Sequence, residues 1–290
     1  MLSAEHNQAI KAVQVFSTGR ASQHKEHRYG TWMPKMMWAL ISQSWIDIPI
    51  NVYVIEHQDG LLLFDAGLDP ALKTDPNYIS SAIGRFFLRR LFRFEISAED
   101  SLDQHLQKLG YAAADVTKVI VSHLHFDHVG GIKEVPQADL LVSSEAWQKL
   151  SDPQAERDFI LREHIELPGA KWQQIEFTPT DDPLLAPFGG CYDVMGDGSM
   201  VLLPTPGHSH GDMSVLVRSS GWPPLLFVGD LTYETNPLMR DQIPGTGDKA
   251  QLKSSYAKVR ALKEQLPELL ILPAHDWQAH EALAALAKRI

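Results

Sequence analysis

Apolar and polar positions follow one another in patterns that predict strands and helices in alternation. Residues 51–57 and 61–64 are apolar segments separated by Gln58-Asp59-Gly60, a sequence typical of a β-hairpin turn. Ser97 is the expected N-cap of a following helix, and Gly110 is placed to end that helix. Three leucines at helical spacing form its buried face: Leu102, Leu106 and Leu109.

Further short apolar segments predict strands at residues 116–121, 139–142, 200–203, 213–217, 225–228 and 269–272. A helix between the last two presents one apolar face, formed by Leu252, Tyr256, Val259 and Leu266, and a final helix covers 277–288. Residues 179–198, rich in Pro, Gly and Asp, are expected to form a long surface loop. No linker divides the chain, so we expect one domain of layered α/β architecture over residues 1–290.

Composition and charge exclude several classes of protein. The 290 residues are 44% hydrophobic and 21% charged, as in ordinary globular proteins. The net charge of −10 and the lack of a basic stripe disfavour nucleic acid as a partner. No run of about 18 apolar residues predicts a membrane span, and the N-terminus does not resemble a signal peptide, so we expect a cytoplasmic protein. The single cysteine, Cys191, excludes an intrachain disulfide and a cysteine-built zinc site.

Candidate chemistry is concentrated in the segment His123-Leu124-His125-Phe126-Asp127-His128. Neutral imidazoles and carboxylates are ligands of zinc, and also of iron, cobalt and manganese. Residues two apart in an extended segment point the same way, so His123 and His125 can share one metal ion. Asp127 and His128, placed after a turn, can serve a second ion beside it.

Three later residues each follow a predicted strand: His208, Asp230 and His275. A strand end on a rigid sheet can aim a ligand accurately. Each signal is weak alone, because Pro-Gly-His is usually only a turn, but in this order together they strongly indicate a metal centre.

These motifs resemble the metallo-β-lactamase superfamily over most of the chain. The resemblance implies a four-layer αβ/βα sandwich with a centre of two divalent metal ions, expected to be zinc, bridged by a water or hydroxide. It implies that His123, His125 and His208 bind one ion, that Asp127, His128 and His275 bind the other, and that Asp230 bridges them. Asp65, in Phe64-Asp65-Ala66-Gly67, would orient one of the ligand histidines.

A centre of this kind predicts hydrolysis, because bound cations lower the pKa of water and polarise the bond under attack. No Gly-x-Ser-x-Gly motif supports a serine hydrolase. Zinc β-lactamases carry a ligand cysteine at the position where this chain has Asp230. The only cysteine of this chain, Cys191, precedes His208 and so cannot take that position, which disfavours a β-lactamase. Glyoxalase II-like thioesterases and phosphotriesterases remain alternatives, as does a hydrolase of another lactone. From another class, a non-hydrolytic metal-binding redox or sensor protein also remains.

Tyr233, three residues after Asp230, resembles a tyrosine of the N-acyl homoserine lactonases. The resemblance implies hydrolysis of the lactone ring of N-acyl homoserine lactones, which is quorum quenching. Tyr233 would stabilise the oxyanion, and Asp127 would carry the proton to the leaving oxygen. Where those lactonases commonly have Pro-Gly-His, this chain has His210-Gly211-Asp212, which leaves the roles of His210 and Asp212 open.

Two segments rich in methionine and aromatic residues are candidates for the substrate side. We expect Trp32, Met36, Phe86 and Phe87 to line a groove for an acyl chain, together with Tyr233. The same segments suit a dimer interface, and the related lactonases often dimerise through an insertion there. An insertion at about residues 70–98 would therefore serve substrate binding, formation of a homodimer, or both.

Overall fold

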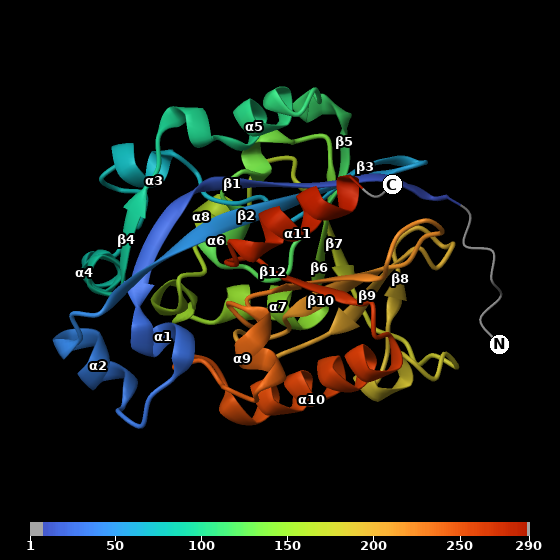
Figure 1. Cartoon of the computed structure of the whole chain (residues 1–290). Coiled ribbons are helices and arrows are strands. Elements are labelled where there is room, and N and C mark those ends of the chain that lie inside the picture. Colours follow the sequence, from blue (N-terminus) through green and yellow to red (C-terminus); the bar gives the residue numbers. More distant parts are fainter. Residues whose placement is uncertain (1–7, 289–290) are drawn as a thin grey trace.

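The computed structural model describes residues 8–288 and consists of two facing β-sheets with helices on their outer faces (Figure 1). The larger sheet has the strand order β4-β1-β2-β3-β5-β6-β7. Its strands are β1 (Ile10–His24), β2 (Trp45–His57), β3 (Gly60–Phe64), β4 (Phe92–Glu95), β5 (Val116–Ile120), β6 (Asp139–Ser143) and β7 (Lys171–Ile175).

The smaller sheet has the order β12-β11-β10-β9-β8. Its strands are β8 (Tyr192–Asp193), β9 (Met200–Pro204), β10 (Met213–Val217), β11 (Leu225–Gly229) and β12 (Leu270–Pro273). Both sheets are mixed: β3, β5, β6 and β7 run parallel in the larger sheet, and β11 and β12 run parallel in the smaller one.

The helices are short apart from one of 17 residues, α10. They are α1 (Lys25–Tyr29), α2 (Lys35–Ile41), α3 (Ala71–Thr74), α4 (Ala82–Leu91), α5 (Leu102–Lys108), α6 (Phe126–Val129), α7 (Ser144–Gln148), α8 (Arg162–Ile165), α9 (Thr235–Met239), α10 (Lys249–Gln265) and α11 (Gln278–Ala287). Short 3₁₀ helices add η1 (Ala98–Asp100), η2 (Ala113–Asp115), η3 (Ile132–Glu134), η4 (Lys149–Ser151), η5 (Ala155–Asp158) and η6 (Ala186–Phe188). No helix within residues 8–288 is long and apolar enough to cross a membrane.

Three clusters of buried side chains hold four layers together. Leu102 and Leu106 of α5 pack on one face of the larger sheet, against residues such as Val119. The other face of that sheet contributes Phe64, which meets Phe227 of the smaller sheet with ring centroids 5.7 Å apart. Leucines of the smaller sheet and the predicted face of α10 form the third cluster. Because alternate strand residues point to opposite faces, each sheet is buried on both sides, which confirms the predicted four-layer sandwich.

The strands and helices predicted from periodicity are present, with two corrections. The hairpin of β2 and β3 pairs Tyr53 with Phe64, and Gly110 has the left-handed φ of 89° expected of a residue that ends a helix. Residues 179–198, expected to form a surface loop, contain η6 and the edge strand β8 and bury Leu185 and Phe188.

The second correction is at a helix start, where the capping box of Ser97 and Asp100 opens only the 3₁₀ helix η1. The following helix, α5, begins one turn later, where the Ser101 side chain accepts from the backbone N–H of Gln104.

Candidate metal centre

The centre lies at one edge of the two sheets, where several strands end. His123 and His125 follow β5, and Asp127 and His128 lie in the short helix α6 that comes next. Three further candidate ligands come from the smaller sheet, after β9, directly after β11 and after β12: His208, Asp230 and His275. The structure thus brings together all the candidate ligands that the sequence indicated, from segments up to 152 residues apart.

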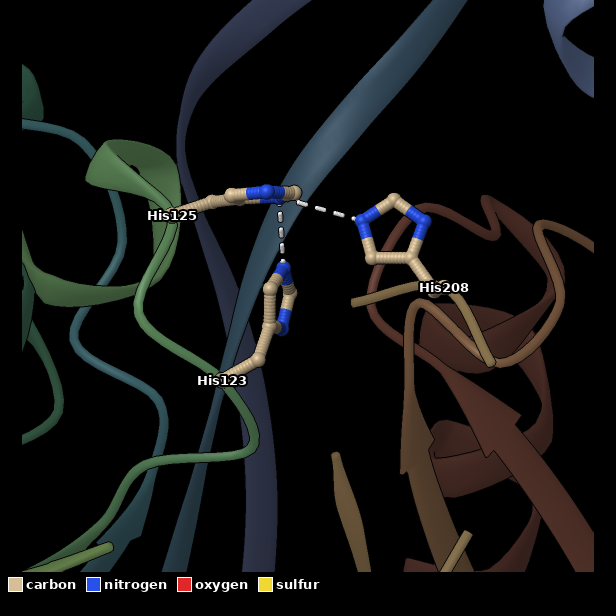
Figure 2. A group of neighbouring side chains, drawn as sticks. All are labelled: His123, His125 and His208. Carbon is tan, nitrogen blue, oxygen red and sulfur yellow. Dashed lines mark hydrogen bonds between the residues drawn. The ribbon is translucent and has the colours of Figure 1, made fainter. Parts of the chain in front are cut away.

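The first group consists of His123, His125 and His208, whose ring nitrogens converge (Figure 2). Nδ1 of His125 lies 2.9 Å from Nε2 of His123 and 3.1 Å from Nε2 of His208. Three imidazole nitrogens in this arrangement match the three protein ligands of an open zinc site.

The second group consists of Asp127, His128 and His275. Oδ2 of Asp127 lies 3.8 Å from Nε2 of His128 and 3.7 Å from Nε2 of His275. Asp230 stands between the two groups: its Oδ1 is 2.9 Å from Nε2 of His275, and its Oδ2 is 3.3 Å from Nε2 of His208. One carboxylate can therefore contact ions held by both groups.

Asp65 orients histidines of both groups from beneath. Its Oδ2 accepts from Nδ1 of His128 at 2.8 Å and from the Ser122 hydroxyl at 2.9 Å. The Ser122 oxygen in turn lies 2.9 Å from Nδ1 of His123. Since these contacts take up the Nδ1 atoms, Nε2 of each ring is left to face a metal ion. The predicted orienting residue is therefore next to His128, and through Ser122 it also reaches His123.

Backbone and loop contacts fix two other ligands. Nδ1 of His275 donates to the carbonyl oxygen of Pro49 at 2.8 Å, which directs its Nε2 toward Asp230. The buried carboxylate of Asp212 accepts from the N–H groups of Gly207 and Ser209, on either side of His208. Asp212 therefore shapes the loop that carries His208, while His210 is exposed and lines the adjoining cavity.

The pKa shifts differ among the candidate ligands: two histidines are held neutral, whereas His128 and Asp230 favour their charged forms. Burial lowers the pKa of His125 to about 3 and that of His208 to about 4, so both rings are neutral and able to bind a metal at pH 7. Burial alone would lower the pKa of His128, but Asp230 and Asp65 raise it well above its ordinary value. Burial opposes ionisation of Asp230, yet His275 and His128 hold its pKa well below the usual range.

The residues present fit divalent metal ions. Within each candidate trio the ligand atoms lie within 4.8 Å of one another. Nε2 of His128 and Oδ1 of Asp230 are buried and only 3.2 Å apart, but neither atom has a hydrogen-bond partner among residues 8–288. Buried polar atoms are rarely left without a partner, and a shared cation would satisfy both. Histidine and carboxylate donors are those that zinc and related ions prefer.

A cavity of about 460 Å³ opens beside this centre, and its lining includes His125, Asp127, His208, Asp230 and His275. The apolar part of its lining is formed by Ala21, Ile48, Leu91, Phe92, Phe94, Phe126, Phe159 and Ile160. The ring of Phe126 packs edge to face against both Phe94 and Phe159, at centroid distances of 5.8 and 6.1 Å. An aromatic wall beside a polar floor is typical of a site for an amphipathic small molecule.

The predicted acyl groove of Trp32, Met36, Phe86 and Phe87 is corrected by the structure. None of the four lines this cavity, and Trp32 is 89% exposed and Phe86 56% exposed. The prediction failed because the high content of methionine and aromatic residues in these two segments does not indicate which of the side chains point into the protein. Phe92 and Phe94, from the same part of the chain, line the cavity instead.

Tyr233 is buried at the cavity, where its ring stacks on His275 with centroids 5.5 Å apart. Burial and the neighbouring Asp230 raise the pKa of its phenol well above 10, so the hydroxyl keeps its proton. Its oxygen lies 3.1 Å from Nε2 of His27, a second buried residue lining the cavity. Sequence reasoning missed His27, because its partner is 206 residues away and no local motif marks it.

Comparison with known proteins agrees with this geometry. A family model described as the metallo-beta-lactamase superfamily matches residues 45–275. The N-acyl homoserine lactonase AttM of Rhizobium radiobacter is 30% identical over 236 residues, which cover 80% of this chain and 84% of that protein.

Two solved structures share the fold. An N-acyl homoserine lactone hydrolase with the product N-hexanoyl-L-homoserine at its catalytic metal centre aligns with a TM-score of 0.75 at 21% identity, covering 94% of this chain and 96% of that one. The dizinc quorum-quenching lactonase AidC aligns with a TM-score of 0.61 at 17% identity, covering 95% and 93%.

The four-layer sandwich and the histidine–carboxylate centre at its edge define a metal-dependent hydrolase. The chain belongs to the metallo-β-lactamase superfamily.

Proposed function

We propose that this hydrolase opens the lactone ring of N-acyl homoserine lactones, with two zinc ions held by the seven candidate ligands. The observation that carries the proposal is the arrangement of one cavity, in which five of the seven candidate ligands, the Tyr233 phenol and an aromatic wall all meet. The similarity to the lactonase AttM supports the same substrate class. A cytoplasmic location stays a prediction of the sequence.

The substrate's two parts match two parts of the cavity. The aromatic wall, with Phe94, Phe126 and Phe159, offers apolar contacts for an acyl chain. The polar part, with Asp127, Asp230 and Tyr233, receives the lactone ring. The substrate's ester carbonyl would then lie beside the Tyr233 hydroxyl and the candidate ligands.

When bound, the two divalent cations supply an activated water at neutral pH and Lewis acidity toward the carbonyl group. Tyr233 keeps its phenolic proton and donates a hydrogen bond to the carbonyl oxygen as negative charge develops there. Asp127, whose side chain is partly exposed to the cavity, accepts the proton released by the attacking water. The same carboxyl group returns the proton to the ring oxygen when the ester bond breaks.

The test is a comparison of substrates with the zinc-loaded enzyme. We expect kcat/KM for N-hexanoyl-L-homoserine lactone to exceed that for a thioester of glutathione and for an aryl phosphotriester by about 100-fold or more. We expect this preference because the acyl chain and the lactone ring together match both the apolar and the polar parts of the cavity lining. A thioester or phosphotriester hydrolysed at an equal or higher kcat/KM would contradict the assignment.

We also propose that the region around residues 70–98 serves both substrate binding and dimerisation. Phe92 and Phe94 of β4 line the cavity, whereas Ile83 and Phe86 of the preceding helix α4 are exposed. The helices α2 and α4 lie at the same end of the molecule and pack through Trp38 and Leu91 (Figure 1). Met36, Met37 and Ile41 of α2 and Trp32, which lies just before that helix, are also exposed apolar side chains. Exposed apolar side chains of this kind form a surface that a second copy of the chain can cover.

Light scattering after gel filtration tests this proposal. We expect a dimer for the native chain and a monomer for Phe86→Glu, because burial of an unpaired carboxylate in an apolar interface is costly. Met239→Glu, at an exposed apolar position on α9, is the matched control and is expected to stay dimeric. A monomeric native chain at micromolar concentration would contradict the interface.

A further inference from the structure

The short helix α1 holds the loop after Asp230 through three consecutive residues. His27 contacts the Tyr233 hydroxyl, Arg28 forms an ion pair with Glu234, and Tyr29 donates to the same Glu234 carboxylate at 3.2 Å. The carbonyl oxygen of His27 also accepts from the N–H of Gly245 at 2.8 Å. Three adjacent residues of α1 thus contact two adjacent residues of the loop after β11, Tyr233 and Glu234.

His27 itself is enclosed by aromatic rings. It is 6% exposed, and its ring lies near Trp38, Phe92 and Tyr233 at centroid distances of 5.9, 5.3 and 5.6 Å. Burial, with His208 and Lys35 nearby, lowers the pKa of His27, so the imidazole is neutral at pH 7. A neutral imidazole has one N–H donor and one acceptor nitrogen.

The surroundings select which nitrogen of His27 carries the proton. Nδ1 of His27 is buried and has no hydrogen-bond partner among residues 8–288. A buried N–H without a partner is rarer in proteins than a buried acceptor without one. The favoured tautomer therefore has its proton on Nε2, the atom that lies 3.1 Å from the Tyr233 oxygen.

We propose that His27 is a positioning residue for Tyr233: its Nε2–H donates to the phenol oxygen, fixes the ring over the metal centre and leaves the phenol's own proton for the substrate. The inference rests on the proposed function, in that Tyr233 is the group that meets the substrate. A hydroxyl that accepts one hydrogen bond becomes a better donor of another, because the two bonds polarise each other. The opposite arrangement, with Tyr233 donating to His27, would occupy the proton that the oxyanion needs.

A double-mutant cycle with zinc-loaded enzyme tests the proposal. His27→Phe keeps the ring volume but removes the donor, and we expect it to lower kcat for N-hexanoyl-L-homoserine lactone by about tenfold with little change in KM. In the Tyr233→Phe background the same substitution should lower kcat by less than about twofold, because the oxygen that it positions is absent. His27→Gln, whose amide can still donate, should recover most of the lost kcat.

The matched control is His24→Phe. His24 is also fully buried and packs against Trp38, but its Nε2 contacts the carbonyl oxygen of Arg90 rather than Tyr233. We expect His24→Phe to lower the unfolding temperature without reducing kcat, which separates loss of packing from loss of the donor. If His27→Phe does not fold, His27→Leu replaces it in the cycle.

Three results would overturn the positioning role. They are an unchanged kcat in His27→Phe, an equal loss of kcat in both backgrounds, and a rise of KM alone. Failure of the proposed function is distinguishable, because it appears in the native enzyme as absence of lactone hydrolysis. The cycle is then run on whichever carboxylic ester or thioester the native enzyme hydrolyses, since its oxyanion needs the same donor.

Discussion

Asp65 accepts a hydrogen bond from Nδ1 of His128 at 2.8 Å, with both side chains 1% exposed. The same carboxylate accepts from the backbone N–H of Ser122 at 2.7 Å, one residue before His123. Asp65 has a left-handed backbone with φ of 63°, a conformation that aspartate adopts more readily than most residues. This one side chain therefore contacts His128 of the second group directly and, through Ser122, also supports His123 of the first group.

Replacement of that carboxylate should weaken metal binding. Both carboxylate oxygens of Asp65 accept hydrogen bonds, one from the Ser122 N–H and the other from the Ser122 hydroxyl and His128. The amide of Asp65→Asn has only one acceptor oxygen, so His128 loses its orienting partner. We expect zinc affinity to fall by about 10- to 100-fold, measured by competition with a chromophoric chelator. Asp69→Asn is the control, because Asp69 is also buried but accepts from Lys133 and Ala71 away from the centre. Equal affinity in the two variants would contradict the orienting role.

Replacement of the candidate ligand His208 should lower the zinc content more than replacement of the nearby His210. His208→Ala removes one of three imidazoles of the first group, and we expect bound zinc to fall by about one ion per chain together with loss of hydrolysis. His210→Ala changes an exposed histidine two residues away and should leave the zinc content near two per chain. Elemental analysis of both proteins decides; full zinc content in His208→Ala would remove His208 from the ligand set.

Zinc affinity should decrease on acidification. In the metal-free protein Asp230 and Asp65 raise the pKa of His128 against the effect of burial, so the ring holds a proton that an incoming cation must displace. At any pH below that raised pKa, each unit of acidification should weaken the apparent affinity by about tenfold for each such proton released. Titration with zinc at several pH values measures the dependence. An affinity that is constant from pH 8 to pH 6 would be inconsistent with a protonated His128.

The aromatic wall should determine the preference for acyl-chain length. Phe94→Ala removes a ring packed against Phe92 and Phe126, so longer chains lose apolar contacts. Each buried methylene contributes about 0.8 kcal/mol, and we expect the ratio of kcat/KM for decanoyl over butanoyl lactone to fall by about tenfold. Phe86→Ala, on the exposed side of α4, should leave the ratio unchanged. A ratio that responds to Phe86→Ala and not to Phe94→Ala would place the acyl chain elsewhere.

Prediction from sequence was most successful where information is local. The histidine motif, its strand and the strand ends that carry His208, Asp230 and His275 are visible in short segments, so the candidate ligands could be identified. Strand β1 was missed, because its register shifts between Ser17 and Arg20, beside Gly19, and breaks the alternation of apolar and polar residues. The contact of His27 with Tyr233 depends on tertiary packing between distant segments, which no local pattern records.

Tyr233 provides the most direct test of lactone hydrolysis at this centre. Its phenol lies at the cavity beside His275 and is not a member of either candidate ligand group, so Tyr233→Phe should keep the full zinc content. The measurement is the rate of ring opening of N-hexanoyl-L-homoserine lactone by the zinc-loaded native enzyme and by Tyr233→Phe. We predict ring-opened product from both, with kcat lower in Tyr233→Phe by about 10- to 100-fold, because one donor to the oxyanion is lost while the cations remain. Absence of ring-opened product from the native enzyme, or equal kcat and KM in the two proteins, would contradict the account.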